Sequence, residues 1–227
     1  MTSRNPKNIH WWNLSPFRKD PLLPHAHIYR QALESLIGPG DLSALDQFSL
    51  HFLMSTSPKW IGGAAGAALG LSIYGLEKRL HNPIHPKWPT RAGFRPIIGR
   101  AADCETTSDL VDLIMAASCV PPVMPGGRYE NQNVLDGGLV DNVPTLLAQD
   151  EPGNTLVLLS RRYGGELPSK KRTVYAQPSV QIKIDKFDYA NPEGLQQAFE
   201  LGLADGGRFA VAGDAYAHRF KIALPTE

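Results

Sequence analysis

Short apolar runs of strand length alternate with helix-like segments along this 227-residue chain, and the alternation restricts its possible folds more than any other feature. Helical spacing of apolar residues predicts helices over 24–37, 107–117 and 191–211, and Thr106 and Asp109 have the spacing of a capping box at the start of the second. Apolar runs predict strands over 48–54, 96–102, 133–135 and 155–159, the last as a buried strand, and 174–184 is predicted to be extended. The sequence therefore predicts an α/β fold with a mainly parallel sheet.

The composition excludes several classes of protein. The chain contains 21 glycines and 19 prolines, which indicate many turns and exclude a coiled coil. Its net charge of +1 gives no support to nucleic-acid binding. Two cysteines, Cys104 and Cys119, cannot form a disulfide framework or a four-thiolate zinc site. We interpret both as small buried hydrophobic residues.

Charge is distributed unevenly along the chain. Residues 1–100 contain 12 basic and 5 acidic side chains, a net of +7, whereas residues 101–153 contain 1 and 9, a net of −8. One interpretation is a dipolar surface whose charges cancel in the folded protein. The other is a basic face for an anionic lipid surface, opposite an acidic region that holds a catalytic carboxylate.

Residues 60–76 form an apolar segment of 17 residues without a charged side chain. A bilayer-spanning helix usually needs about 20 apolar residues, so we predict a Gly/Ala-rich helix within the domain, with membrane contact as the alternative. Gly62, Gly66 and Gly70 recur at every fourth residue, a spacing that allows close helix packing. Residues 1–20 lack the apolar core of a secretory signal, which predicts a cytoplasmic or peripheral membrane location.

The main candidate for chemistry is the segment N-V-L-D-G-G-L-V-D-N-V-P at 133–144. A short apolar run ends in Asp136, and Gly137 and Gly138 follow directly. The glycines permit a tight turn and remove side-chain bulk beside the carboxylate, which could then act as a general base. Aspartate before glycine is also common in ordinary turns. Asp141 and Asn142 are interpreted as caps of a helix that Pro144 opens.

This segment, together with A-A-S-C-V-P-P-V-M-P at 116–125 and the tail at 177–202, resembles the carboxyl half of a patatin-like phospholipase domain. The resemblance covers most of the chain from about Pro24 onward. It implies a three-layer α/β fold and a serine–aspartate dyad that hydrolyses acyl esters of phospholipids or other lipids. It also implies that no metal or cofactor is needed. Only Asp136, supported by Gly137 and Gly138, matches the family's site residues.

The family's nucleophilic serine lies in a G-x-S-x-G motif, and no serine of this sequence does. Ser72 comes closest, but it lies inside the apolar segment and lacks the strand–turn–helix context of a nucleophile elbow. We therefore expect residues 1–227 to form a single, partial domain that lacks the amino-terminal strands and the elbow and is inactive alone. The alternative is a non-catalytic protein of the same fold that binds lipid or membrane surfaces.

Histidine spacing raises a third possibility, a metal site. His25 and His27 lie two residues apart, and His81 and His85 lie four apart, as zinc ligands on a helix do. Pro83 falls between the second pair and interrupts a helix there. We therefore predict neither a metal nor a cofactor.

Overall fold

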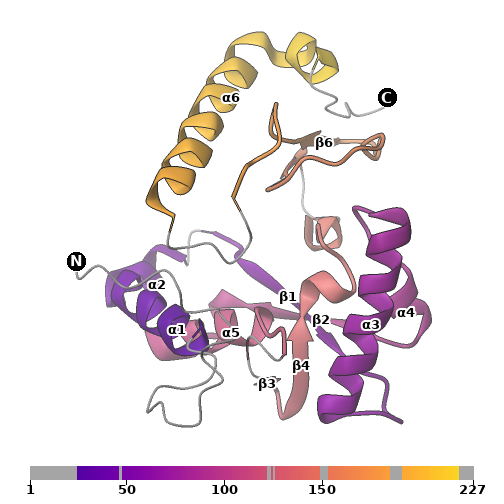
Figure 1. Ribbon diagram of the computed structural model, residues 1–227. Coiled ribbons are helices and arrows are strands. Elements are labelled where there is room, and N and C mark those ends of the chain that lie inside the picture. The colour runs from indigo at the N-terminus through magenta and orange to yellow at the C-terminus, as the bar shows by residue number, and fades with distance from the viewer. Residues whose placement is uncertain are drawn as a thin grey trace. The chain divides into compact units, whose positions relative to one another are not determined.

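The computed structural model describes residues 25–45, 48–121, 124, 126–148, 153–184 and 191–219 (Figure 1). The described residues form two compact units, one within Asn8–Pro144 and the other within Thr145–Glu227. The single domain predicted from the sequence stays a prediction, as does the three-layer arrangement.

The Asn8–Pro144 unit contains a four-stranded sheet in the order β2-β1-β4-β3. Every pair of neighbours in it is antiparallel, so the expectation of a mainly parallel sheet is not confirmed. β3 and β4 are joined by Glu130 and Asn131, whose φ angles of 47° and 61° are those of a type I′ hairpin turn. The strands span His51–Thr56 (β1), Arg95–Arg100 (β2), Gly127–Tyr129 (β3) and Gln132–Asp136 (β4).

Helix α5, Thr107–Ala117, covers one face of this sheet and contacts β1, β3 and β4. Its predicted capping box is confirmed: Thr106 and Asp109 exchange side-chain and backbone hydrogen bonds. The buried core beneath the helix consists of Met54, Leu113, Ala116 and Val134.

Two further helices precede the sheet, α1 (His25–Leu36) and α2 (Pro39–Leu45), and α1 packs against α5. The 3-10 helix η2, Ala101–Asp103, ends the strand predicted over 96–102.

The apolar segment at 60–76 lies largely within α3, Gly63–His81. Two of its glycines, Gly66 and Gly70, pack inside this unit, because a Cβ atom on Gly70 would lie 2.7 Å from the ring of Phe94 and one on Gly66 would lie 2.9 Å from Ser57. Within the described residues, α3 and every other helix is too short or too polar to cross a bilayer.

Glu77 fixes the connection from α3 to the short helix α4, Trp88–Arg91. Its carboxylate is buried and accepts hydrogen bonds from the backbone N–H groups of Lys87 and Trp88, at 2.9–3.1 Å. Charge-assisted bonds of this kind each contribute roughly 1.5–3 kcal/mol. They also satisfy the first N–H groups of α4, which have no partner within the helix.

The second unit is built on β5 (Thr155–Leu158) and β6 (Thr173–Ala176), a parallel pair, with the 3-10 helix η4 (Thr145–Ala148) and α6 (Pro192–Arg219). Val157 is buried, but Leu156 and Leu158 are 50% and 75% exposed. The prediction of a fully buried strand at 155–159 is therefore wrong, because only one face of β5 is covered. Within the predicted extended segment 174–184, the strand ends at Ala176.

Candidate functional site

Asp136 is the last residue of β4 and opens the 3-10 helix η3, Gly137–Leu139. Its backbone N–H donates to the carbonyl of Cys119 at 2.8 Å, and its carbonyl accepts from Ser55 Oγ at 3.0 Å. Strand pairing sets Asp136 opposite Met54 of β1. These two bonds fix its main chain on both sides, and the residue is half-buried. Its strand is antiparallel to both neighbours, so Asp136 does not lie at the carboxyl end of a parallel strand, where the ligand sites of open α/β sheets usually lie.

The Asp136 carboxylate is held by the turn that follows it. The Gly138 N–H donates to Asp136 Oδ1 at 2.6 Å, the bond of an aspartate that caps a helical turn. A Cβ atom on Gly138 would lie 2.9 Å from that same oxygen. Gly138 therefore provides the donor and leaves the space that the carboxylate occupies.

Gly137 serves a different purpose, the close approach of the turn to strand β1. A Cβ atom on Gly137 would lie 2.2 Å from the carbonyl oxygen of Leu53, a separation that no side chain permits. Neither Gly137 nor Gly138 is among the described residues with positive φ. These positions therefore require glycine because a side chain would not fit, and not because the backbone adopts a conformation that only glycine favours.

Two further polar contacts join residues 141–142, just after the turn, to Tyr74 of α3 and to His85. Asn142 Oδ1, 3.4 Å from the Cβ position of Gly138, accepts a hydrogen bond from Tyr74 OH at 2.8 Å. Asp141 Oδ1 lies 2.7 Å from His85 Nδ1 and accepts from the N–H of Val143 at 3.0 Å. The polar cluster thus consists of Tyr74, His85, Asp136, Asp141 and Asn142.

The sequence did not predict the contributions of Tyr74 and His85 to this cluster. Asp141 caps the N–H two residues ahead, as in an Asx turn, and η4 begins at Thr145, one residue after the helix start predicted at Pro144. The only sequence signal for His85 was its spacing from His81, which suggested a metal. The His81 ring instead packs edge-on against Trp88, with centroids 5.6 Å apart. Within the described residues, no three His, Cys, Asp or Glu side chains gather as a metal site.

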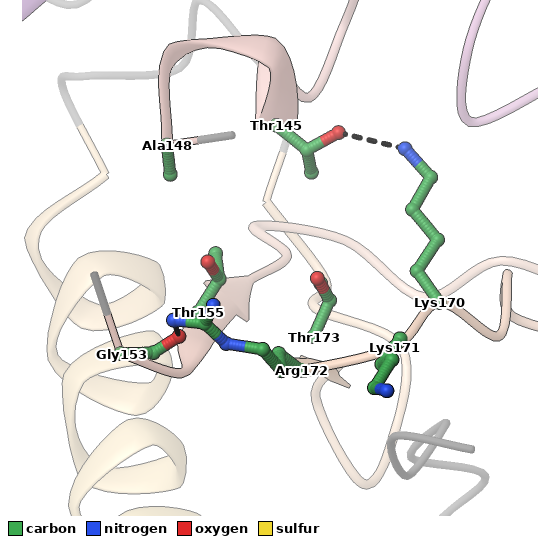
Figure 2. A pocket seen from close by; sticks show the side chains of 8 residues that line it. All are labelled: Thr145, Ala148, Gly153, Thr155, Lys170, Lys171, Arg172 and Thr173. Atoms are coloured by element: carbon green, nitrogen blue, oxygen red, sulfur yellow. Dashed lines mark hydrogen bonds between the residues drawn. The ribbon is translucent and has the colours of Figure 1, made fainter. Parts of the chain in front are cut away.

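Neither Ser55 nor Ser72 has the setting of a nucleophile. Ser55 is fully buried, and its hydroxyl donates to the main chain of Asp136. Ser72 lies inside α3 and is exposed, so it has no strand–turn–helix context. The cavity shown in Figure 2 has a volume of about 310 Å³ and is lined by residues 145–173 of the second unit, none of them from the polar cluster.

Cys119 is an ionisable residue whose thiol pKa depends on the charge of Asp136. Burial first, and the Asp136 carboxylate second, raise the pKa of the Cys119 thiol to about 11. The thiol also donates to the carbonyl of Met115 at 3.2 Å. At neutral pH it is therefore protonated and a poor nucleophile.

The model of the patatin-like phospholipase family matches residues 2–148, more than half of the chain. The match begins before Pro24 and ends before the tail at 177–202. No curated protein and no solved structure matches the chain significantly.

We expect Gly137→Ala to lower the free energy of unfolding by about 2–4 kcal/mol, because the new methyl group would overlap the main chain of β1. Gly126→Ala is the matched control, since a Cβ atom there meets nothing within 4 Å. Urea denaturation measures both. Equal stability of the two variants would contradict the close approach of Gly137 to Leu53.

We expect Asp136→Asn to speed the alkylation of Cys119 by iodoacetamide at pH 8, because removing the negative charge lowers the thiol pKa. Asparagine keeps an oxygen that can accept from the Gly138 N–H. Asp103→Asn is the control: burial, then Asp109 and then Asp103 raise the pKa of Cys104, so this variant should affect Cys104 alone. Peptide mass spectrometry gives both rates. An unchanged Cys119 rate in Asp136→Asn would show that no charged carboxylate lies beside the thiol.

Proposed function

Because the chain belongs to the patatin-like phospholipase family, we propose that it carries the aspartate half of a lipid acyl hydrolase, with Asp136 as the general base. The substrate class is a phospholipid or another lipid ester. Gly137 and Gly138 support the site by seating the turn and the carboxylate. No cofactor or metal is part of the proposal. The expected location is the cytoplasm or the membrane periphery.

The observation that carries this proposal is the fixed Asp136 carboxylate. Its Oδ1 accepts from the Gly138 N–H at 2.6 Å, and the side chain is half-buried. An ionised carboxylate has about four acceptor positions on its two oxygens, and the backbone bond to Oδ1 fixes the orientation of the group. Orientation before the reaction is what a general base requires.

In the proposed reaction, the hydroxyl of a nucleophilic serine gives its proton to Asp136 while Oγ attacks the ester carbonyl. The carbon–oxygen bond to the alcohol then breaks, and the alcohol leaves with the proton from Asp136. Water, deprotonated by the same carboxylate, releases the fatty acid and restores the serine. Each proton taken up by Asp136 is thus returned.

The nucleophile is the part that this sequence does not supply. No serine lies in G-x-S-x-G, and Ser55 and Ser72 are unsuitable for the reasons given above. We therefore propose that the 227 residues alone do not hydrolyse esters, and that activity requires a serine elbow from additional chain.

The test measures p-nitrophenyl butyrate hydrolysis by the 227-residue chain and by a chain extended by the residues encoded in frame before Met1. We expect no turnover from the first. If the extension contains G-x-S-x-G, we expect turnover from the second and at least a hundred-fold loss on Asp136→Asn, within the range for a general base.

Asp103→Asn in the extended chain is the matched control, because it makes the same change at an exposed carboxylate that pairs only with Arg100 among the described residues. Its rate should equal that of the parent. Full turnover of the extended Asp136→Asn variant would remove Asp136 from the mechanism. Activity of the 227-residue chain itself would show that the nucleophile lies within it.

A second candidate function, binding to a lipid surface without catalysis, is favoured by exposed apolar residues beside basic ones. Trp60, next to Lys59, is 74% exposed. Leu76 and Leu80 of α3, which flank Arg79, are 52% and 60% exposed. An exposed indole among cations suits the interface of an anionic bilayer.

For this second candidate we expect the chain to float with phosphatidylserine vesicles at low ionic strength and to separate from them at about 1 M salt, where the Debye length is about 3 Å. Trp60→Ser should weaken flotation, whereas Leu203→Ser on α6, an exposed apolar residue of the other unit, should not. Absence of flotation at low salt would rule out this function.

A further inference from the structure

A cavity of about 310 Å³ lies at one end of the β5–β6 pair in the second unit. Figure 2 shows the side chains that line it. This volume is at the lower limit of pockets that bind small molecules. The side chains that line it are mainly cations and hydroxyls, from Lys170, Lys171, Arg172, Thr145, Thr155 and Thr173. It is separate from the Asp136 turn in sequence and in composition.

The parallel pairing of β5 and β6 builds this cavity. Thr155 and Thr173 are the first residues of their strands and are paired in register, so both strands begin at the same edge. The turn before β6 is closed by a bond from the Thr173 N–H to the Lys170 carbonyl at 3.1 Å. The Thr155 N–H donates to the Arg172 carbonyl at 2.7 Å, which fixes that turn against β5.

Three consecutive cations therefore lie at this edge, and all three are exposed. Within the described residues, no carboxylate forms an ion pair with Lys170, Lys171 or Arg172. Lys170 Nζ donates to Thr145 Oγ at 3.1 Å, and the Arg172 guanidinium donates to the carbonyl of Gly153 (Figure 2). Both partners are neutral, so these two bonds do not offset the positive charge of Lys170 and Arg172.

The backbone of Arg172 adds an independent observation. Its φ of 60° lies in the left-handed region, which is unfavourable for a residue with a side chain and favourable for glycine. Glycine would relieve this strain, yet the position holds a guanidinium that points along the cavity edge. Strained residues of this kind concentrate at functional sites.

The chemistry of the lining selects the ligand. Guanidinium, ammonium and hydroxyl groups all donate hydrogen bonds to a tetrahedral oxyanion, and arginine matches phosphate oxygens in pairs. The apolar part of the described lining is limited to Ala148 and the threonine methyl groups, which is too little to hold an acyl chain. We propose that this cavity binds a phosphate group, carried either by a small soluble molecule or by a phospholipid head group. The proposal goes beyond acyl hydrolysis and does not depend on Asp136.

The test is calorimetric titration of the full chain with inorganic phosphate at constant ionic strength. We expect saturable binding to one site and at least tenfold weaker binding to the double variant Lys170→Gln/Lys171→Gln, equivalent to about 1.4 kcal/mol. Lys183→Gln is the matched control, because Lys183 is an exposed cation of the same unit outside the cavity. Absence of phosphate binding by the parent chain, or equal weakening by Lys183→Gln, would overturn the proposal.

Arg172→Gly separates binding from folding. Glycine suits the left-handed backbone, so we expect the variant to fold, as judged by circular dichroism, and to bind phosphate at least tenfold more weakly. Unchanged affinity of this variant, together with unchanged affinity of the double lysine variant, would overturn the proposal.

Vesicles of phosphatidylcholine, with and without phosphatidic acid, identify the source of the phosphate. Stronger binding to the phosphatidic acid vesicles that is lost in Lys170→Gln/Lys171→Gln would assign the cavity to a lipid head group. Vesicle binding that the double variant does not change, combined with its loss of inorganic phosphate binding, would assign it to a soluble phosphate compound.

Discussion

The close approach of Gly137 to the main chain of β1 is the contact on which the candidate site depends. With no side chain at this residue, the turn after β4 lies against the Leu53 carbonyl, and any Cβ atom would come within 2.2 Å of that oxygen. Asp136 directly precedes this turn, and its main chain is also held by bonds to Cys119 and Ser55 on either side. The Gly138 N–H then orients the carboxylate. The bond that closes the turn is thus the same bond that holds the carboxylate in place.

Much of the local structure could be predicted from the sequence, because it depends on short-range interactions. The helix over 107–117 was predicted with its bounds, since Thr106 and Asp109 form a capping box and the apolar residues follow at helical spacing. The strand ending in Asp136 was also predicted, although it begins at Gln132. Strand direction was not predictable in the same way. An apolar run indicates a strand but contains no information on whether its neighbours are parallel.

The contacts that define both sites depend on residues far apart in sequence. Strand β3 was missed for a local reason: Glu130 and Asn131 form its hairpin turn without the glycine that usually marks one. Tyr74 reaches Asn142, and His85 reaches Asp141, across 68 and 56 residues. Thr145 and Lys170 meet over 25 residues. Only the pairing of β5 with β6 brings Thr155 and Thr173 to one edge.

The two units also differ in how completely they bury their apolar residues. The core under α5 is closed, with Met54 and Val134 at 0% and 1% exposure. In the second unit, β5 leaves Leu158 75% exposed, and Leu195, Phe199 and Leu203 recur every four residues along α6 at 48%, 62% and 63% exposure.

Parallel strands are usually covered on both faces, and a pair of strands gains little stability by itself. Apolar burial therefore contributes less to the second unit than to the first. There, polar contacts such as the 2.9 Å bond from the Ser179 N–H to Asp205 account for a larger share of the stability. An anion bound among the three cations would add to that share, because a ligand that binds only the folded state stabilises it.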